Sequence, residues 1–374
     1  MAPTQQISGR AGAAGTAAYA ARHADRLAPQ HFRSFAELKL SSIGFGTYLG
    51  RYDDETDAAY RAAIDRALAL GCNVVDTAIN YRCMRSERSI GAALKQAIAA
   101  GRLRREEVVI ATKGGFVPFD GAPPPDPEEN FHNTYVATGI CRAEDLVAGC
   151  HCMSPAYLAD QIRRSRENLG LETIDIYYLH NPETQKPEVG AEEFLKRIRA
   201  AFELLESKVA AGEIALYGTA TWDGYRSDPN DSGYLSLSEL EAVAREIGGA
   251  QHHFRAIQLP LNLALPEAFS FFNQAHDGKA FSTLQLAADL GLITMASASI
   301  FQSRLARNLP AELGKVFPGL KSDAQRALQF TRSTPGLTTA LVGMAQIQHV
   351  EENLDTARVD PAPERRFMQL FQTQ

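Results

Sequence analysis

Short apolar runs alternate with amphipathic, helix-like patterns along most of the chain. The runs are rich in Val, Ile, Leu, Ala and Tyr, as expected of strands buried on both faces of a parallel sheet. Eight of them are predicted as strands, at 43–47, 73–76, 108–112, 174–179, 214–219, 255–259, 292–296 and 338–342. Helical periodicity follows each in turn, at 54–70, 86–100, 155–169, 191–211, 236–247, 281–290, 322–333 and 346–357. Eight strand–helix units predict an α/β fold, a closed (β/α)8 TIM barrel, over an open doubly wound sheet.

Two segments depart from this alternation. Residues 1–31 are rich in Ala, Gly and Arg, and we interpret them as an N-terminal extension, a loose arm that can order against the single barrel domain of residues 32–374. Residues 114–154 are rich in Gly and Pro and stretch the distance from Lys113 to His180 to 67 residues (180 − 113), whereas one strand–helix unit needs about 30. We expect 114–154 to be an active-site loop insertion that narrows the pocket.

Composition and charge exclude several classes of function. The net charge is −6 and no basic tract occurs, so nucleic acid is not expected as a partner. The chain contains no run of eighteen apolar residues, so a membrane span is not expected. The first 30 residues lack the apolar core of a secretion signal. Five cysteines in 374 residues do not resemble a disulfide framework. We expect a cytoplasmic protein that acts on a small molecule, with an oligomeric state that the sequence leaves open.

Four polar residues stand at or just beyond the ends of consecutive apolar runs. Asp76 ends NVVD, Tyr81 follows it, Lys113 ends VVIATK and His180 ends IDIYYLH. Because the C-terminal ends of barrel strands meet at one face, these groups are expected to converge there. Taken singly, each has an ordinary explanation: a cap or surface charge, a solvated lysine, a core histidine. Their shared position at matching strand ends favours a catalytic site.

The four side chains together suit proton transfer. The phenol of Tyr81 has a reference pKa near 10, which a neighbouring Lys113 cation is expected to lower. Asp76 can hold the ammonium group, and His180 can hydrogen-bond a substrate oxygen or relay its proton. This set fits protonation of a carbonyl oxygen while hydride arrives at carbon, and the reverse for an alcohol. Since none of the four can supply hydride, a nicotinamide cofactor is required.

The chain resembles the aldo-keto reductase superfamily over about residues 40–354. The resemblance is carried by IGFGTYLG (43–50), GCNVVDTAINY (71–81), SERSIGAAL (86–94), VVIATK (108–113) and DIYYLHNPE (175–183). It implies a (β/α)8 barrel that binds NADPH or NADH and exchanges hydride with a carbonyl or alcohol substrate. It also implies catalytic roles for Asp76, Tyr81, Lys113 and His180, with Tyr81 as general acid or base.

The resemblance further implies the cofactor contacts. Those near the nicotinamide are Gly46, Thr47, Tyr48, Asp76, Thr221 and Gln258. Those near the adenosine phosphates and the adenine are Gly343, Met344, Ala345, His349, Glu352 and Asn353. The family's Ser-Asn pair after the fifth strand is replaced by Ala220 and Thr221, and its Ser-Pro-Leu-Gly loop after the seventh strand is missing. His349 stands where a 2′-phosphate partner often lies, which favours NADP, with NAD as the alternative; an ordinary amphipathic helix is the other interpretation of 346–354.

The insertion contains a cluster of sulfur and imidazole groups. AGCHCM (148–153) places Cys150 and Cys152 around His151, with Cys141 upstream. A Cys/His metal site is one interpretation, but the spacing is not that of a zinc knuckle. We favour a packed lid whose thiols behave as small apolar groups, and no metal. In a third interpretation His151 or one of the thiols reaches the substrate. The predicted substrate contacts are Tyr48, His151, Trp222 and Phe301.

Three functions remain open from the sequence. An NAD(P)-dependent oxidoreductase is the leading hypothesis. The altered cofactor motifs also fit a regulatory subunit that binds the nucleotide with little turnover. A tightly held cofactor used for transient oxidation would instead make the protein an epimerase or lyase.

Overall fold

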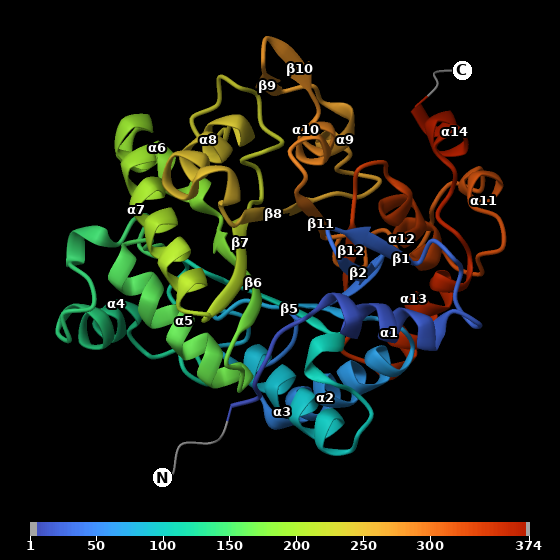
Figure 1. The fold of residues 1–374 in the computed structure, drawn as a ribbon, viewed down its shortest axis with the longest axis horizontal. Helices are drawn as coiled ribbons and strands as arrows, with labels where there is room; N and C mark the ends of the chain where they lie inside the picture. The colour runs from blue at the N-terminus through green and yellow to red at the C-terminus, as the bar shows by residue number, and fades with distance from the viewer. Residues whose placement is uncertain (1–5, 372–374) are drawn as a thin grey trace.

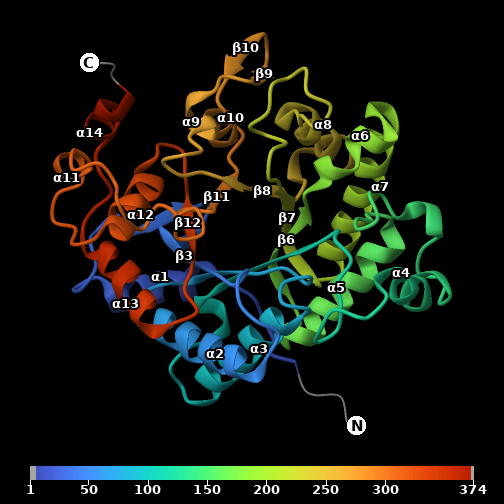
Figure 2. The same cartoon turned by 180° about the vertical axis from the view of Figure 1, so that it is seen from behind.

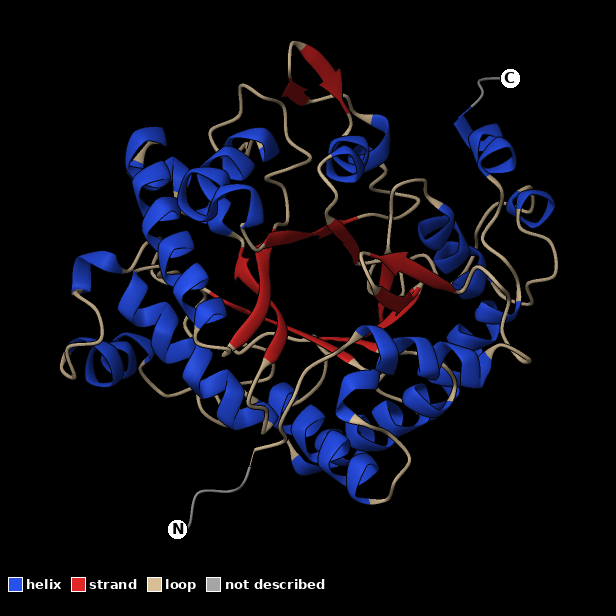
Figure 3. Ribbon diagram, viewed as in Figure 1, coloured by secondary structure: helices blue, strands red, loops and turns tan. Residues whose placement is uncertain are grey.

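The computed structural model describes residues 6–371, and its centre is a closed barrel of eight parallel strands. Figure 3 shows the strands as an inner ring enclosed by helices. All eight apolar runs become barrel strands, which confirms the predicted (β/α)8 fold. In their order around the barrel they are β3 (Ile43–Gly46), β4 (Val74–Asp76), β5 (Val109–Gly114), β6 (Ile174–His180), β7 (Ile214–Ala220), β8 (Phe254–Pro260), β11 (Ile293–Ser297) and β12 (Thr339–Gly343), which pairs with β3.

Eight helices follow the barrel strands and cover their outer faces. They are α2 (Asp54–Ala69), α3 (Arg85–Ala99), α5 (Pro155–Leu169), α7 (Ala191–Ala210), α8 (Leu237–Gly248), α10 (Thr283–Asp289), α12 (Asp323–Ser333) and α13 (Ile347–Asp355). Local chemistry sets their starts: the Asp53 side chain accepts the N–H of Thr56 at 2.8 Å and caps α2. These bounds lie close to the predicted helical segments.

Burial on both faces explains why the strands read as continuous apolar runs. All seven residues of β6 are buried. Inward side chains such as Val74, Ile176 and Met295 form one cluster inside the barrel, and the outward ones pack against the helices in a second, larger cluster. The Asp, Lys, Arg and His side chains of the eight barrel strands accordingly lie at a strand end or one residue from it.

The N-terminal segment packs across the N-terminal end of the barrel (Figure 1). It contains α1 (Ala13–His23) and an antiparallel hairpin of β1 (Phe32–Phe35) and β2 (Leu38–Ser41). The N–H of Ala11 donates to Asp175 Oδ1 at 2.7 Å, and the buried Tyr19 hydroxyl donates to the carbonyl of Leu68. Residues 6–31 are thus ordered against the barrel. Figure 2 views the molecule from the opposite end.

Shorter elements lie in the loops. The insertion holds α4 (Pro127–Phe131), the π-helical turn His132–Val136 and the 3-10 turn Ala143–Asp145. The others are α6 (Lys186–Val189), α9 (Glu267–Ser270), α11 (Leu313–Val316), α14 (Glu364–Phe367), the hairpin β9 (Gln274–His276) and β10 (Lys279–Phe281), and 3-10 turns at Arg105–Glu107, Pro182–Thr184, Gly249–Gln251, Thr356–Arg358 and Met368–Phe371. Within residues 6–371, none of the helices has the length and apolar character that a bilayer crossing requires.

Candidate active site

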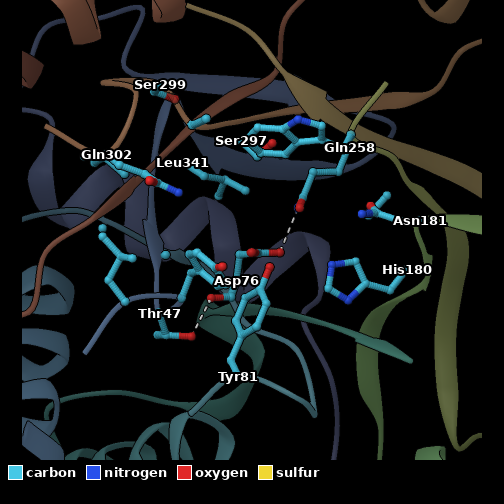
Figure 4. A pocket seen from close by; sticks show the side chains of 18 of the residues that line it. Thr47, Asp76, Tyr81, His180, Asn181, Gln258, Ser297, Ser299, Gln302 and Leu341 are labelled. Atoms are coloured by element: carbon cyan, nitrogen blue, oxygen red, sulfur yellow. Dashed lines mark hydrogen bonds between the residues drawn. The ribbon is translucent and has the colours of Figure 1, made fainter. Parts of the chain in front are cut away.

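A cavity of about 540 Å³ opens at the C-terminal ends of the barrel strands. Residues at or just after all eight strands line it. In Figure 4, Tyr81 and His180 point toward the same space, with Asp76 and Gln258 beside them. This size and position are typical of a small-molecule site in a TIM barrel.

Asp76 and Lys113 form a buried ion pair beside the cavity. Lys113 Nζ lies 2.7 Å from Asp76 Oδ2 and donates a second hydrogen bond to the carbonyl of Thr77 at 2.7 Å. Gln258 Nε2 donates to the other carboxylate oxygen at 2.8 Å (Figure 4). Burial raises the pKa of Asp76 and lowers the pKa of Lys113, and the attraction between the two opposes both shifts. Each charge is therefore held in place by the other.

Tyr81 lies against this pair. Lys113 Nζ is 5.0 Å from the centroid of the Tyr81 ring, and the His180 ring meets it edge-on at 5.7 Å. Burial raises the pKa of Tyr81 well above its usual value, and the Asp76 carboxylate and Tyr48 add to the rise. The expectation that Lys113 lowers the pKa of Tyr81 is wrong, because burial of the phenol is the largest effect and outweighs the field of the ammonium group. The phenol therefore stays protonated at neutral pH.

His180 ends β6 and is neutral. Burial lowers the pKa of His180 well below its usual value, and the Lys113 cation lowers it further. Its ring nitrogen Nδ1 has no hydrogen-bond partner among residues 6–371. The next residue, Asn181, turns the chain through a left-handed conformation (φ 45°) and donates its N–H to the carbonyl of Ala220 at 2.6 Å. The neutral imidazole can thus hydrogen-bond an oxygen in the cavity.

Part of the predicted cofactor set lines the cavity. These residues are Gly46, Thr47, Tyr48, Asp76, Thr221, Gln258 and Gly343. The Thr47 hydroxyl donates to the carbonyl of Asp76 at 3.1 Å (Figure 4) and is thereby engaged. The buried hydroxyl of Thr221, in contrast, has no hydrogen-bond partner in the described chain. An unpartnered buried hydroxyl at a cavity wall is a ready contact for a polar ligand group.

The rest of the predicted cofactor set lies outside the cavity. Met344 is buried in the core, and Asn353 is buried on α13. His349 and Glu352 are exposed on the same helix, and Ala345 is half-buried before it. The first turn of α13 thus lies outside the cavity, whereas Gly343 at the end of β12 still lines it, and no side chain caps the first turn of α13.

Of the predicted substrate contacts, Tyr48 and Trp222 line the cavity and are exposed. Phe301 does not line it, although its neighbours Ile300 and Gln302 do. His151 is buried one layer behind the wall, next to His180. Residues 114–154 contribute only Phe116 to the lining.

Most of the insertion packs on itself. Cys141 and Cys152 are buried in a small cluster with Phe131, Tyr135 and Tyr157, and Cys150 is exposed. Burial raises the pKa of all three thiols. Among residues 6–371, no three His, Cys, Asp or Glu side chains gather as metal ligands would.

Sequence reasoning missed several cavity residues. Phe116 and Asn181 directly follow strand ends at Gly114 and His180, and this position was a usable signal. Ser299 and Gln302 lie in the irregular loop after β11, where Phe301, Gln302 and Ser303 have positive φ angles. No periodic pattern marks such a loop, so its side chains could not be placed beforehand.

Comparisons with known proteins bear on the family and the fold. The sequence profile of the Aldo/keto reductase family matches residues 42–227. D-threo-aldose 1-dehydrogenase from a Pseudomonas species is 28% identical over 193 residues, which are 49% of this chain and 50% of that protein. The chain thus spans about half the length of this curated relative.

Two solved structures share the fold. An aldo-keto reductase from Bacillus halodurans, in its holo form, is 20% identical with a TM-score of 0.62, and the match covers 92% of this chain and 97% of that one. An aldo/keto reductase from Klebsiella pneumoniae, in complex with NADP and acetate, is 18% identical with a TM-score of 0.61 and coverages of 91% and 95%.

Proposed function

Because the chain belongs to the aldo/keto reductase family, we propose that it is an NAD(P)-dependent oxidoreductase acting on a small carbonyl or alcohol substrate in the cavity described above. The observation that carries this proposal is the convergence of Tyr81 and His180 beside the buried Asp76–Lys113 pair. A phenol, a neutral imidazole and a charge-compensated ammonium group can bind a substrate oxygen and transfer a proton to it.

The protonation states favour carbonyl reduction. Burial keeps the pKa of Tyr81 high, so the phenol enters the reaction with its proton and can act as general acid. As the proton leaves, negative charge develops on the phenol oxygen. The ammonium group of Lys113 is close enough to stabilise that charge. Asp76 holds Lys113 in place, and His180 orients the substrate oxygen.

The cavity residues fit a nicotinamide ring. A carboxamide carries both donors and an acceptor, and the walls present the unpartnered hydroxyl of Thr221 and the side-chain amide of Gln258. Gly46 and Gly343 add no side chain, and a Cβ at Gly343 would meet open space. A bound nicotinamide cofactor supplies the hydride that none of these side chains can provide.

The preference for NADP is part of the proposal. The aldo/keto reductase from Klebsiella pneumoniae, which has the same fold, was solved with NADP. In this chain the exposed His349 on α13 is the candidate partner for the 2′-phosphate. Since a neutral His binds phosphate more weakly than Arg, we expect NADPH to be preferred over NADH by only a modest factor.

The variant Tyr81→Phe tests the function. It removes the acidic proton and should lower kcat for NADPH-dependent reduction of an aldehyde such as 4-nitrobenzaldehyde by about 10²–10⁴-fold. Cofactor binding, followed by quenching of Trp222, the only tryptophan, should be retained. Tyr217→Phe is the matched control, because it removes the same hydroxyl from a tyrosine that is buried in the core and donates to Glu206 outside the cavity.

Three outcomes separate the hypotheses. Near-normal turnover by Tyr81→Phe refutes the assigned acid. Wild-type protein that binds NADPH without turning over any of a panel of aldehydes and ketones indicates a regulatory nucleotide-binding role. Cofactor that co-purifies and is not consumed indicates an epimerase or lyase.

A further inference from the structure

The insertion leaves and re-enters the barrel at the same point, directly beside His180. Near its two ends, Phe116 and His151 form an antiparallel bridge. The N–H of Cys152 donates to the carbonyl of Gly115, and the N–H of Val117 donates to the carbonyl of Cys150, both at 2.9 Å. The two ends of the insertion are therefore hydrogen-bonded to each other, and Phe116 at this junction lines the cavity.

His151 is the centre of a buried hydrogen-bond chain. Its Nε2 lies 2.7 Å from the carbonyl oxygen of His180, and its Nδ1 lies 3.0 Å from Gln185 Nε2. Gln185 Oε1 in turn accepts from Arg197 Nη1 at 3.0 Å.

The partners determine the direction of each bond. A carbonyl only accepts, so Nε2 of His151 carries the proton and Nδ1 accepts from the Gln185 amide. The Arg197 guanidinium only donates, which orients the Gln185 amide in the same sense. The chain runs without conflict from α7 to the backbone of His180. Burial lowers the pKa of His151 to about 4, which keeps the ring neutral, as this pattern of hydrogen bonds requires.

Close packing around His151 and His180 fixes their relative position. The Phe116 ring stands edge-on to the His180 ring at 5.0 Å and to the His151 ring at 5.1 Å. A Cβ at Gly115 would lie 2.6 Å from His151 Nε2 and 3.1 Å from the carbonyl oxygen of His180. Glycine at this position lets the two histidines meet, and its φ of +139° is one that other residues avoid.

We propose that His151 is a positioning residue: it holds the backbone of His180, and with it the imidazole, at the cavity wall, and the insertion exists in part to deliver it. His151 does not line the cavity, so it acts through its neighbours in the wall, Phe116 by packing and His180 by the hydrogen bond. The catalytic consequence rests on the proposed function, whereas the hydrogen-bond chain does not. Misplacement of a catalytic group by about 1 Å can cost about 100-fold in rate.

The variants His151→Leu and His151→Gln test the proposal. Leucine keeps the apolar volume but removes the donor, and kcat for 4-nitrobenzaldehyde with NADPH should fall by about 10–100-fold, with NADPH affinity unchanged. Glutamine can donate to His180 and accept from Gln185, so it should recover the rate to within about threefold of the wild type. A purely structural role would not predict rescue by glutamine together with a loss confined to kcat.

His31→Leu is the matched control. His31 is also buried, with Nε2 3.0 Å from the carbonyl of Gly71 and Nδ1 3.2 Å from the Ser42 hydroxyl. It lies by the hairpin at the opposite end of the barrel, so its loss should lower stability and leave kcat unchanged.

A second measurement needs no turnover. Long-range ¹H–¹⁵N spectra of histidine-labelled protein should show His151 at pH 7 with its proton on Nε2, and the His180 resonances should shift in His151→Leu but not in His31→Leu. His151 with its proton on Nδ1, or His180 resonances and kcat that are both unchanged in His151→Leu, would overturn the proposal. Absence of turnover in the wild type would instead count against the proposed function, and the spectra would still decide the positioning role.

Discussion

Removing the Lys113 cation should expose how much this site depends on charge compensation. The side chains of Lys113 and Asp76 are only 1% and 7% exposed, and their charged atoms are 2.7 Å apart. At that distance, with an effective dielectric constant of about 20, their Coulomb attraction is about 6 kcal/mol. In Lys113→Met the carboxylate keeps only the hydrogen bond from Gln258. Loss of one partner from a buried pair costs about 3–5 kcal/mol, and we expect a loss in that range.

The double variant Lys113→Met/Asp76→Asn isolates the cause. Asparagine is neutral and can still accept from Gln258, so the double variant should recover at least about 2 kcal/mol of the free energy of unfolding. Urea denaturation at pH 7, followed by circular dichroism, measures both variants against the wild type. If the loss came from packing around the methionine, the single and double variants would be equally unstable.

The pH dependence provides the sharper check. Without Lys113, burial leaves the folded-state pKa of Asp76 above its unfolded value of 3.8. The folded chain then holds a proton that the unfolded chain releases, so the penalty is absent below pH 3.8 and grows until the pH passes the folded pKa. The stability gap between single and double variants should therefore widen from pH 5 to pH 8. A loss below about 1 kcal/mol, or a gap that does not change with pH, would refute the reasoning.

Three further predictions concern stability and are checked by urea denaturation. Burial lowers the pKa of His23 and His151 to about 4 and that of His31 to about 3, from the ordinary value of 6.5. The free energy of unfolding should therefore be highest above pH 6.5 and fall toward pH 4, by up to about 1.4 kcal/mol per pH unit for each histidine. A profile that is flat over this range would contradict the prediction. Burial raises the pKa of Glu183 to about 7 from 4.5, so Glu183→Gln should gain about 3 kcal/mol relative to the wild type as the pH rises through that range, and no gain would contradict it. A Cβ at Gly218 would lie 1.7 Å from a backbone oxygen of β8, so Gly218→Ala should lose at least about 2 kcal/mol; a stable variant would show that β7 can shift.

The barrel could be predicted because burial on both faces leaves a clear trace in the sequence. Strand β6 has no exposed residue, and its side chains before His180 are therefore apolar or aromatic with one exception. That exception, Asp175, accepts hydrogen bonds from Arg105 and from the N–H of Ile110 near the N-terminal end of the barrel. The proposed catalytic residues Asp76, Lys113 and His180 were predicted by the same logic, because they stand at or next to the C-terminal ends of their strands.

The N-terminal elements left no comparable trace. Helix α1 reads AAGTAAYAARH, in which small residues dominate and only Tyr19 is large and apolar. Its position depends on the buried side chains of Thr16, Tyr19 and His23. It also depends on close approach to η1, the 3-10 turn at Arg105–Glu107, where a Cβ at Gly15 would lie 2.3 Å from the carbonyl oxygen of Glu106. Such close backbone contacts are a tertiary property, and composition alone reads the same segment as a loose arm.

The site electrostatics show why the chemistry was harder to predict than the positions. The sequence places a lysine near Tyr81 and so suggests a lowered pKa, but the sign depends on what else lies within a few ångströms. Burial removes water that would stabilise a phenolate, and the carboxylate of Asp76, 2.7 Å from Lys113, offsets part of the ammonium field. Desolvation then outweighs the remaining field, and the pKa of Tyr81 rises. The same reasoning applies to His151, whose buried neutral ring turns a residue that looks like a substrate contact into a support for His180.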